Sequence, residues 1–370
     1  MATLKKVLSN AVVIPILLSI APIGANAAFY TLTDLGTLPG DANSVAQGIN
    51  AFGVVTGRSD SGVGPDGQAY RWQGSMTGLG TLGGAESTGW AISDDGTVVG
   101  NAQNASGQYR AFYDDGTMHD LGTLGGSDSY ARDISNTGQI VGDAQTGSGS
   151  YHATLWSGGS VSDLGTLGGS GSYGMAINES GVTVGYSLLV GDASSEAFVW
   201  DQSNGMQGLG TLGGADSEAH DINDSGTIVG FSDAAGGQVR GFMYTSGGGM
   251  VDLGSLGGDE GSRAFAINNS GQIVGHSSYT SGMPMTHAFL YENGGIVDLN
   301  TLVVGASGWT LMEARDINDS GQIVGFAMFD GQVRGFLLTE TTIDDPVPLP
   351  GTLWLLIGTL GVLVRRVHGA

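Results

Sequence analysis

A seven-residue tract recurs along this chain at nearly constant spacing, and the recurrence limits the folds that the chain can adopt. The clearest copy, residues 120–126, reads Asp-Leu-Gly-Thr-Leu-Gly-Gly. Related copies begin at Asp34, Gly78, Asp163, Gly208, Asp252 and Asp298, and with residue 120 included the steps are 44, 42, 43, 45, 44 and 46 residues. Repeats with a period of 20–50 residues indicate solenoids, propellers or arrays.

Four short segments separate one tract from the next, and each has the composition of a β-strand. Within residues 221–254 they read Asp-Ile-Asn, Thr-Ile-Val-Gly, Gly-Phe-Met-Tyr and Met-Val-Asp-Leu-Gly. Such short runs of β-branched and aromatic residues, bounded by Gly, Asn, Asp or Ser, are typical of strands. An Asn-x-x-Gly spacing between the first two segments predicts a tight hairpin, because Asn starts the turn and Gly adopts a positive φ. Its glycine is present in every repeat: Gly53, Gly96, Gly138, Gly181, Gly226, Gly271 and Gly321.

The order of the segments predicts a closed ring. Four consecutive antiparallel strands of about 40–45 residues make one propeller blade. A lone copy of the fourth segment stands at residues 29–35, and the last repeat ends after its third segment at residues 335–338. We therefore predict an all-β, seven-bladed β-propeller over residues 28–340, closed by its N-terminal strand. A β-solenoid is the alternative.

Charge and composition exclude several classes of function. The chain carries a net charge of −23, and both of its lysines and two of its arginines lie in the two terminal segments. The repeats therefore hold eight arginines against 35 acidic residues, a balance that repels nucleic acid. The chain has no cysteine, which excludes disulfides and thiol chemistry.

The N-terminus has the pattern of a secretory signal peptide. Lys5 and Lys6 precede a mostly apolar run at residues 11–20, and Ala25-Asn26-Ala27 matches a cleavage site. We predict a signal peptide over residues 1–27 and a mature start at Ala28. An uncleaved membrane anchor is the alternative, although the apolar run is short for a helix that crosses a membrane.

The C-terminus carries a second sorting pattern. A linker at residues 341–350 ends in Pro348-Leu349-Pro350, and an uncharged apolar run at residues 351–364 precedes Arg365 and Arg366. This order resembles the PEP-CTERM sorting domain of Gram-negative bacteria in its Val-Pro-Leu-Pro variant, with Leu and Gly where Glu and Ala are usual. The resemblance implies transient membrane anchoring of residues 351–370 and processing by an exosortase. An ordinary C-terminal membrane anchor is the alternative.

The repeats themselves resemble a known family. The tripeptide His287-Ala288-Phe289, with related copies at residues 110–112 and 196–198, is similar to the HAF repeat of probable extracellular proteins. The Asp-Leu-Gly-Thr-Leu-Gly-Gly and Ile-Asn-x-x-Gly-x-Ile-Val-Gly patterns also match that repeat, and the match covers residues 34–338. The resemblance implies an exported bacterial protein at the cell surface or in the extracellular matrix. It implies no catalytic residue.

Motifs for enzyme chemistry are weak. Residues 78–83 and 208–213 match G-x-G-x-x-G, but a dinucleotide site also needs a helix after that loop, and none is predicted. No G-x-S-x-G or H-E-x-x-H pattern occurs. Paired acids such as those at residues 94–95 and 114–115 lie in predicted turns, and the aromatic residues Trp156, Trp200 and Tyr244 are interpreted as packing between blades.

Calcium is the one cofactor that the residues suggest. Asp221 and Asn223, and likewise Asp316 and Asn318, space oxygen ligands as a Ca²⁺ loop begins. The twelfth positions are Ser232 and Ala327 rather than Glu, so we favour a turn over a Ca²⁺ site.

Arg-Asp pairs at residues 132–133 and 315–316 share one repeat position, which favours ion pairs in the channel over an anionic-ligand site.

These observations favour an exported, non-enzymatic protein with a binding or structural role. The predicted partners are the export and exosortase machinery and an exopolysaccharide or surface protein. An extracellular carbohydrate-active enzyme that uses two facing carboxylates is one alternative. A Ca²⁺-stabilised adhesin is another.

Overall fold

The computed structural model describes residues 29–64, 66–257, 261–279 and 285–341. The predicted signal peptide with Ala25, Ala27 and Ala28 falls outside these residues. So do the C-terminal motif at Pro348, Leu349 and Pro350 and the basic pair Arg365 and Arg366. Within the described residues, no helix is long and apolar enough to cross a membrane.

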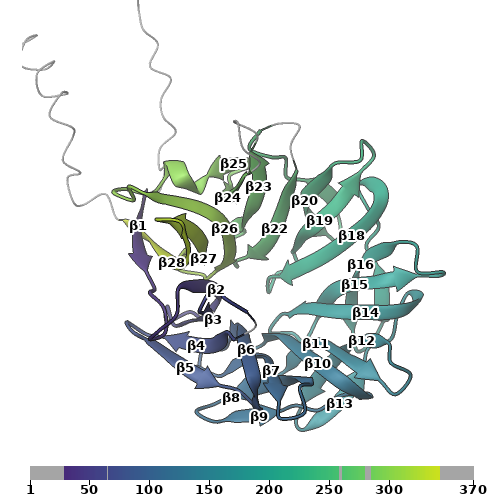
Figure 1. Ribbon diagram of the computed structural model, residues 1–370. Helices are drawn as coiled ribbons and strands as arrows, with labels where there is room; N and C mark the ends of the chain where they lie inside the picture. Colours follow the sequence, from purple (N-terminus) through teal and green to yellow (C-terminus); the bar gives the residue numbers. More distant parts are fainter. Residues whose placement is uncertain (1–28, 65, 258–260, 280–284, 342–370) are drawn as a thin grey trace, which may run out of the picture.

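Seven four-stranded antiparallel sheets stand around a common axis (Figure 1). Each sheet is a blade, and in blades 1 to 6 the strands follow one another from the inside of the ring to the outside in chain order. Blade 1 contains β2 (Asn43–Ile49), β3 (Val55–Asp60), β4 (Gln68–Trp72) and β5 (Met76–Gly80). Blade 2 contains β6 (Gly83–Ile92), β7 (Val98–Asn104), β8 (Tyr109–Asp114) and β9 (Met118–Asp120).

The next three blades repeat this order. Blade 3 contains β10 (Gly125–Ile134), β11 (Ile140–Thr146), β12 (Tyr151–Ser157) and β13 (Ser160–Asp163). Blade 4 contains β14 (Gly168–Ile177), β15 (Thr183–Leu189), β16 (Ser195–Asp201) and β17 (Gly205–Gly208). Blade 5 contains β18 (Gly213–Ile222), β19 (Ile228–Ala234), β20 (Val239–Thr245) and β21 (Gly249–Asp252).

The last two blades differ from the others at their outer strands. Blade 6 contains β22 (Ser262–Ile267), β23 (Ile273–Tyr279), β24 (Met285–Glu292) and β25 (Gly295–Asp298), and a 3₁₀ turn follows at Leu299–Thr301. Blade 7 contains β26 (Trp309–Ile317), β27 (Ile323–Phe329) and β28 (Gln332–Thr341), and its fourth strand is β1 (Phe29–Asp34) from the other end of the chain.

The N-terminal strand closes the ring, as predicted. β1 pairs with β28 in register from Phe29↔Thr341 to Asp34↔Phe336. The backbone N–H of Tyr30 also donates to the carbonyl of Leu302, at 3.0 Å, which ties β1 to the segment between blades 6 and 7. Both the seven-bladed propeller and its mode of closure are therefore confirmed, and the β-solenoid alternative is wrong. Closure leaves no blade without a neighbour.

The first hairpin of each blade forms as its Asn-x-x-Gly pattern predicts. In blade 1, Gly53 has φ +75° and donates its N–H to the carbonyl of Asn50 at 3.1 Å. The Asn50 side-chain oxygen accepts the N–H groups of Phe52 and Val54 at 3.1 and 2.9 Å. The turn therefore satisfies its own backbone groups and ends the inner strand at the same place in each repeat.

Every inner strand also contains a β-bulge two residues before its final isoleucine. The register shifts between Ala131 and Asp133 in blade 3, and at the equivalent position in the other six blades. The second strand approaches closely here. A Cβ atom on Gly142 would lie 1.9 Å from the carbonyl oxygen of Tyr130, so this position requires glycine. Bulges change the direction in which a side chain points.

The apolar core lies between the blades. One aromatic side chain from the third strand is fully buried in six of the seven blades: Tyr70, Phe112, Phe198, Phe242, Phe289 and Phe336. Blade 3 has Thr154 at this position. Valines and isoleucines of the first and second strands, such as Val229 and Ile273, pack around these rings. Each blade thus buries its faces against two neighbours, which explains why the repeats are so similar.

Replacing Tyr30 by Ala should weaken the closed ring. Its side chain is fully buried, and removal of a large buried side chain costs about 3 kcal/mol of unfolding free energy. Phe29, in the same strand, is 40% exposed, so Phe29→Ala should change the unfolding free energy by less than about 0.5 kcal/mol. Chemical denaturation of both variants checks the prediction. Equal losses would contradict a specific role for Tyr30 in closure.

Candidate functional site

Three rows of side chains vary from blade to blade although the residues around them are nearly constant. The first row holds the bulge residues of the inner strands: Gln47, Trp90, Arg132, Met175, His220, Phe265 and Arg315. The second row lies two residues earlier: Val45, Thr88, Tyr130, Tyr173, Glu218, Arg263 and Glu313. The third row follows the close-approach glycine of the second strand: Arg58, Asn101, Asp143, Tyr186, Phe231, His276 and Phe326.

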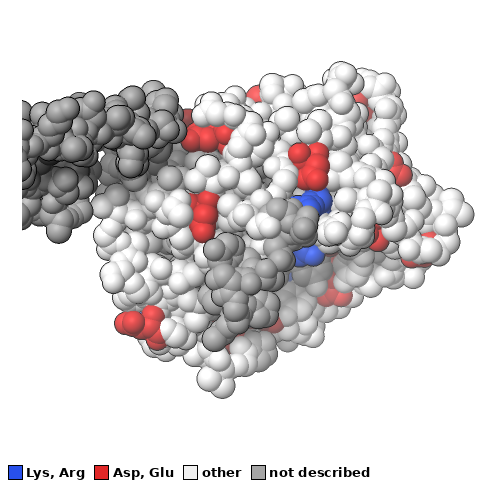
Figure 2. Space-filling model, turned by 90° about the horizontal axis from the view of Figure 1, so that it is seen from above, with Lys and Arg blue, Asp and Glu red and all other residues white. Residues whose placement is uncertain are grey.

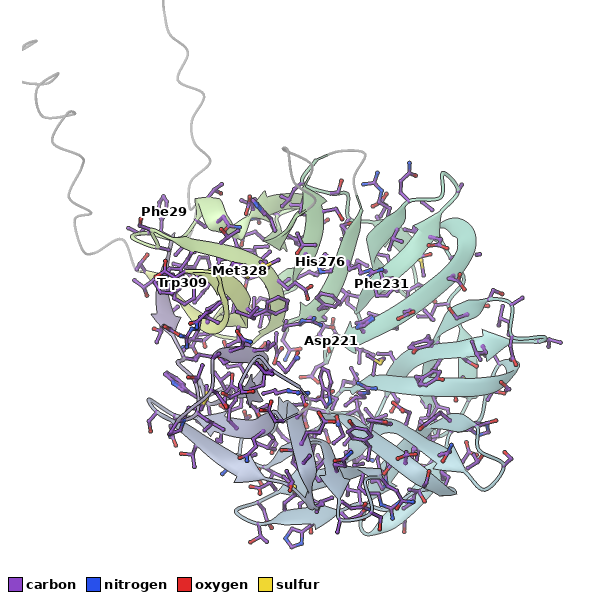
Figure 3. All side chains as sticks on the ribbon, viewed as in Figure 1. Phe29, Asp221, Phe231, His276, Trp309 and Met328 are labelled. Atoms are coloured by element: carbon purple, nitrogen blue, oxygen red, sulfur yellow. The ribbon has the colours of Figure 1, made fainter. Side chains whose placement is uncertain are left out.

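The strand pairing brings these three variable rows together. Residues of the second and third rows are direct partners across the first two strands, as in Tyr173↔Tyr186 and Glu218↔Phe231. The rows lie on the inner half of each blade, between the bulge and the start of the inner strand. They therefore form a ring of varied chemistry around the channel, towards the face where the chain passes from blade to blade. Figure 3 shows Phe231 and His276 on neighbouring blades, with Asp221 near the centre of the ring.

Tyrosines dominate one side of this ring, across blades 2 to 4. Tyr130 stacks on Tyr109 with ring centroids 5.7 Å apart and lies 6.1 Å from Tyr151. Tyr173 stacks on Tyr151 at 6.4 Å and on Tyr186 at 4.7 Å. All five rings are only partly exposed, and burial raises the pKa of four of them: Tyr130, Tyr151, Tyr173 and Tyr186. A hydrogen bond to Glu86 raises the pKa of Tyr109, so all five hydroxyls remain protonated donors at neutral pH.

A cluster of His, Phe and Arg occupies the other side, across blades 5 to 7. The ring of Phe265 meets His220 at 5.5 Å and His276 at 5.2 Å, and the guanidinium of Arg315 lies 4.6 Å from its centroid. Glu313 contacts His276 at 3.5 Å and Arg315 at 2.5 Å. Burial acts to raise the pKa of Glu313, but these two partners outweigh burial, and the pKa lies below its ordinary value. Glu313 is therefore an ionised acceptor.

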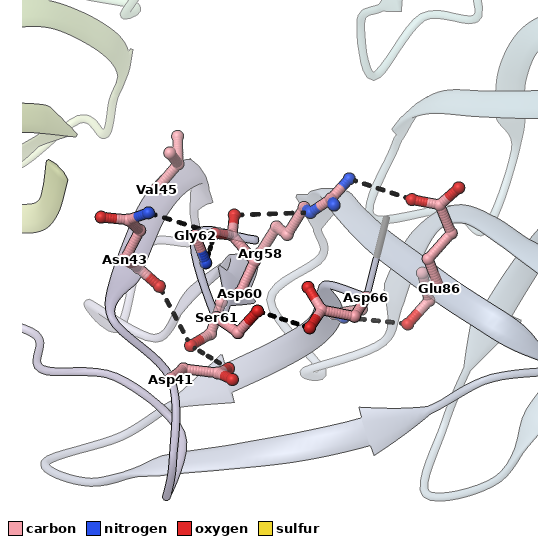
Figure 4. A network of polar contacts seen from close by, with 12 residues as sticks. Asp41, Asn43, Val45, Arg58, Asp60, Ser61, Gly62, Asp66 and Glu86 are labelled. Atoms are coloured by element: carbon pink, nitrogen blue, oxygen red, sulfur yellow. Dashed lines mark hydrogen bonds and ion pairs between the residues drawn. The ribbon is translucent and has the colours of Figure 1, made fainter. Parts of the chain in front are cut away.

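The variable rows gather basic residues in a chain that is strongly acidic. They contain four of the eight arginines of the repeats: Arg58, Arg132, Arg263 and Arg315. Arg132 pairs with Asp143 at 3.2 Å and lies 5.2 Å from the ring of Trp90. Arg58 pairs with Glu86 at 3.3 Å, beside a network of turn hydrogen bonds that includes Ser61 and Asp66 (Figure 4). Most of these charges are thus compensated locally, and the ring is close to neutral.

The outer surface has a different character. Figure 2, which views the molecule at right angles to Figure 1, shows acidic groups scattered over this side and basic groups gathered at one place. Scattered acids suit a solvated surface, whereas four of the eight arginines of the repeats lie with aromatic residues around the channel.

Three partly buried aspartates lie beside the first row and join neighbouring blades. Asp133 accepts hydrogen bonds from the N–H of Ile134 at 2.8 Å and from that of Ile177 in the next blade at 2.9 Å. Asp221 and Asp316 bind the next blade in the same way, through Ile267 at 2.7 Å and Ile49 at 2.8 Å. All three residues keep an intermediate exposure to solvent.

Burial raises the pKa of all three carboxyls. The hydrogen bonds from the isoleucine N–H groups oppose the shift but do not cancel it, and the pKa values of Asp133 and Asp316 reach about 6. The pKa of Asp221 is also raised by burial, and the charges of Asp133 and Asp316 add to the effect. These groups remain partly protonated in mildly acidic solution.

The opposite mouth of the channel is a ring of turns. Asn50 donates from its side chain to the carbonyl of Ser93 in blade 2, at 3.0 Å. Four further asparagines make the same contact with the next blade at 2.9 to 3.3 Å: Asn178, Asn223, Asn268 and Asn318. The residues that follow these asparagines continue the pattern, as when Asp94 accepts the N–H of Ala51 at 3.0 Å. This mouth is occupied by contacts between blades.

The residues weighed as Ca²⁺ ligands take part in these contacts. The oxygens of Asp221 and Asp316 accept backbone N–H groups. The side-chain oxygens of Asn223 and Asn318 each accept an N–H and a serine hydroxyl of their own turn. Among the described residues, no group of three or more His, Asp or Glu is arranged to hold a metal ion. Stabilisation by Ca²⁺ remains a prediction from the sequence alone.

The arginine–aspartate pairs read from the sequence have other partners in the structure. Arg132 binds Asp143 and Arg315 binds Glu313, while their sequence neighbours Asp133 and Asp316 bind backbone of the next blade. The G-x-G-x-x-G matches lie in β5, in β17 and in the connections that follow them, and each connection leads into another strand. Trp156 and Tyr244 pack against residues of the neighbouring blade, and Trp200 packs beside Phe198.

Apart from Arg132 and Arg315, the variable rows were not among the residues predicted from the sequence. A signal was present, because the residue after each Val-Gly and the residue two positions before each Ile change while their neighbours do not. Aligning the repeats against one another would have isolated these positions. Their meeting in space could not be predicted, because it depends on the bulge.

Comparisons with known proteins support the fold alone. No protein-family model matches the chain, and no curated protein matches it. Among solved structures, the chain is similar to puromycin hydrolase, with a TM-score of 0.56, 15% identity, and coverage of 85% of this chain and 55% of that one. It also resembles TolB from Acinetobacter baumannii, with a TM-score of 0.42 and 16% identity over 66% of this chain and 63% of that one. Streptogramin B lyase gives a TM-score of 0.46 and 10% identity over 85% and 98%.

The stabilising effect of Asp316 should depend on pH in the direction opposite to that of an ordinary surface acid. The pKa of Asp316 rises on folding. Its contribution to the unfolding free energy is therefore complete below about pH 4 and is lost as the pH rises through 6. The loss of unfolding free energy in Asp316→Ala should therefore be about 2 kcal/mol larger at pH 4 than at pH 7.5. Urea unfolding at the two pH values measures this difference.

Asp201 is the control for the sign. Hydrogen bonds from Asn204 and Ser203 lower its pKa, so its contribution should be lost as the pH falls rather than as it rises. The same pH trend for Asp201→Ala and Asp316→Ala would contradict the assignment.

Proposed function

We propose that this protein is an exported, non-enzymatic β-propeller that binds a polysaccharide at the ring of variable rows. The sorting patterns at the two ends and the resemblance to HAF repeats support export to the cell surface or the extracellular matrix. An exosortase-type system would process the C-terminal segment. The arrangement of the variable rows supports the binding role.

One observation carries the proposal. Beside the bulge of each inner strand, residues that differ from blade to blade stand among Ser, Gly and Ile positions that recur in most blades, and strand pairing brings the three variable rows together towards one mouth of the channel. Positions that only maintain the fold make the same contacts in every blade, so their residues vary little from blade to blade. The varied positions are free of that constraint, and they hold aromatic, hydroxyl, amide and paired charged groups, as ligand sites do.

The chemistry of the rows fits sugars. Partly exposed tyrosine rings present apolar faces to the C–H faces of a sugar, and their protonated hydroxyls donate hydrogen bonds. Arg132, held by the buried Asp143 at 3.2 Å, offers a fixed donor without a large net charge. The five tyrosines extend over three blades, which suits several units of a polymer rather than one small molecule.

A carbohydrate-active enzyme is the second candidate, because Asp133, Asp221 and Asp316 have the raised pKa values of proton donors. Their geometry favours a structural role, since both oxygens of each carboxyl already bind backbone N–H groups. A general acid must reach the leaving group of its substrate, and these oxygens face the junction between two blades.

Tyr173→Ala should weaken binding to matrix polysaccharide by at least about tenfold, because an aromatic side chain at the centre of an interface carries a large share of its affinity. Phe52→Ala is the matched control. Phe52 is 76% exposed in the first hairpin, at the opposite mouth, and its loss should leave binding unchanged. Calorimetry with purified exopolysaccharide measures both. Equal effects, or the release of shorter chains during the titration, would contradict the proposal.

Export is tested separately. Cells expressing the full chain should release the repeats or hold them at the surface, whereas a chain that lacks residues 344–370 should be missing from its normal fraction. Immunoblots of culture medium, envelope and cytoplasm measure the distribution. An unchanged distribution would contradict a sorting role for the C-terminal segment.

A further inference from the structure

We propose that the junction of blades 2 and 3 contains a second binding site, which takes one neutral sugar unit. The site is a cleft of about 490 Å³ between the two blades, on the face of the first hairpins. This volume lies within the range of about 300–1,000 Å³ that small-molecule sites have. Its walls include Tyr113 and Asp120 of blade 2 and Trp156 and Ser135 of blade 3. It lies away from the variable rows, so this inference and the proposed function can fail independently.

The cleft contains a buried donor without a partner. The Trp156 side chain is only 3% exposed, and among the described residues its indole Nε1–H has no hydrogen-bond acceptor. Leaving such a donor unpaired costs about 1–3 kcal/mol. A bound molecule with an acceptor oxygen would satisfy it. Of the indole groups at this repeat position, only that of Trp156 combines full burial with an unpaired donor in the described part of the chain.

The equivalent cleft between blades 1 and 2 shows what is different here. There Arg71 and Asp114 occupy the positions of Tyr113 and Trp156, and they bind each other at 3.1 Å across the junction. That pair joins the two blades through the Arg71 Nη2 atom, which also donates to the carbonyl of Asp114 at 3.2 Å. At the junction of blades 2 and 3, two aromatic rings replace the ion pair, and they leave an apolar wall together with the indole N–H.

At this junction the first hairpins are joined by Asp94 and Asn136, at 2.8 and 3.0 Å, and not by the asparagine contact seen in most blades. Five of the seven blades have an asparagine whose side chain reaches the next blade, but blade 2 has Ser93. The Ser93 hydroxyl turns back to Asp95 at 2.6 Å and does not cross to blade 3. The short side chain leaves room in the wall of the cleft.

Charge decides the class of ligand. The cleft holds the carboxylates of Asp95 and Asp120, and hydrogen bonds from Ser93 and Thr97 lower the pKa of Asp95, so it stays ionised. The neighbouring Arg110 is already bound to Asp120 at 3.0 Å. These surroundings repel anions and offer acceptors for hydroxyl groups, while the aromatic wall suits an apolar ring face. A neutral, hydroxyl-rich ring with an acceptor oxygen for Trp156 fits the negative charge, the aromatic wall and the unpaired indole N–H of this cleft.

The test uses the full-length protein and saturation-transfer NMR with glucose, galactose, mannose and xylose. At least one of these sugars should bind. If glucose binds, glucuronate should bind at least about tenfold more weakly, and if galactose binds, the same should hold for galacturonate. Trp156→Phe should weaken binding about tenfold, because it removes the buried donor. Trp200→Phe, at the same position of the next blade, should leave it unchanged.

Ser93→Asn provides a variant that keeps the fold. The substitution gives blade 2 the asparagine that blade 1 has as Asn50. The amide group of the new asparagine should reach blade 3 and narrow the cleft. Binding should fall about tenfold while thermal stability is kept or increased. The proposed site would be overturned if none of the four sugars bound, or if the affinity were unchanged in both Trp156→Phe and Ser93→Asn. Loss of the binding signal in Tyr173→Ala would also overturn it.

Discussion

Each blade is held to the next by side chains that bind the neighbouring backbone, and two of them recur most often: the serine of the inner strand, in six blades, and the asparagine of the first hairpin, in five. The oxygen of Asn50 completes its own turn, and its amide group donates to the carbonyl of Ser93 in the next blade. One residue thus determines both the local hairpin and the position of the adjacent blade. Backbone groups at the ends of the inner strands would otherwise lack partners inside the ring, where leaving them unpaired is costly.

The asparagine contacts lie at one mouth of the channel, and inner-strand serines such as Ser172 join the blades on the other side of the bulge. The bulge in each inner strand separates the two regions. On the side of the first hairpin, Asp133 and its equivalents Asp221 and Asp316 bind the next blade. On the side where the inner strand begins, residues of the second and third rows pair across the first two strands. The asparagine contacts and the variable rows therefore lie at different ends of the same strands. This division allows residues such as Tyr173 and Arg263 to differ between blades without weakening the junctions.

The architecture was readable from the sequence because its signals are local and are repeated seven times. Each Asn-x-x-Gly determines a hairpin by backbone geometry alone, and the displaced strand at residues 29–35 indicates closure through simple counting. The site was not readable in the same way. The partners of Arg132 and Arg315 are set by strand register and by the bulge, neither of which the sequence displays. The unpaired indole of Trp156 depends on what two blades lack at their junction, and a repeat pattern cannot show this.

The partly buried aspartates have a consequence for the number of blades. They occur in blades 3, 5 and 7, and each faces an alanine or a glycine at the same position of the following blade: Ala176, Ala266 and Gly48. Two aspartates in succession would place buried carboxyls side by side, which their mutual repulsion disfavours. Strict alternation cannot close on an odd number, so blades 1 and 2 both carry a small residue, Gly48 and Ala91. The alternation of aspartate and small residue is therefore broken between blades 1 and 2. The ring could lose one repeat at that junction and still keep all three aspartates in non-adjacent blades.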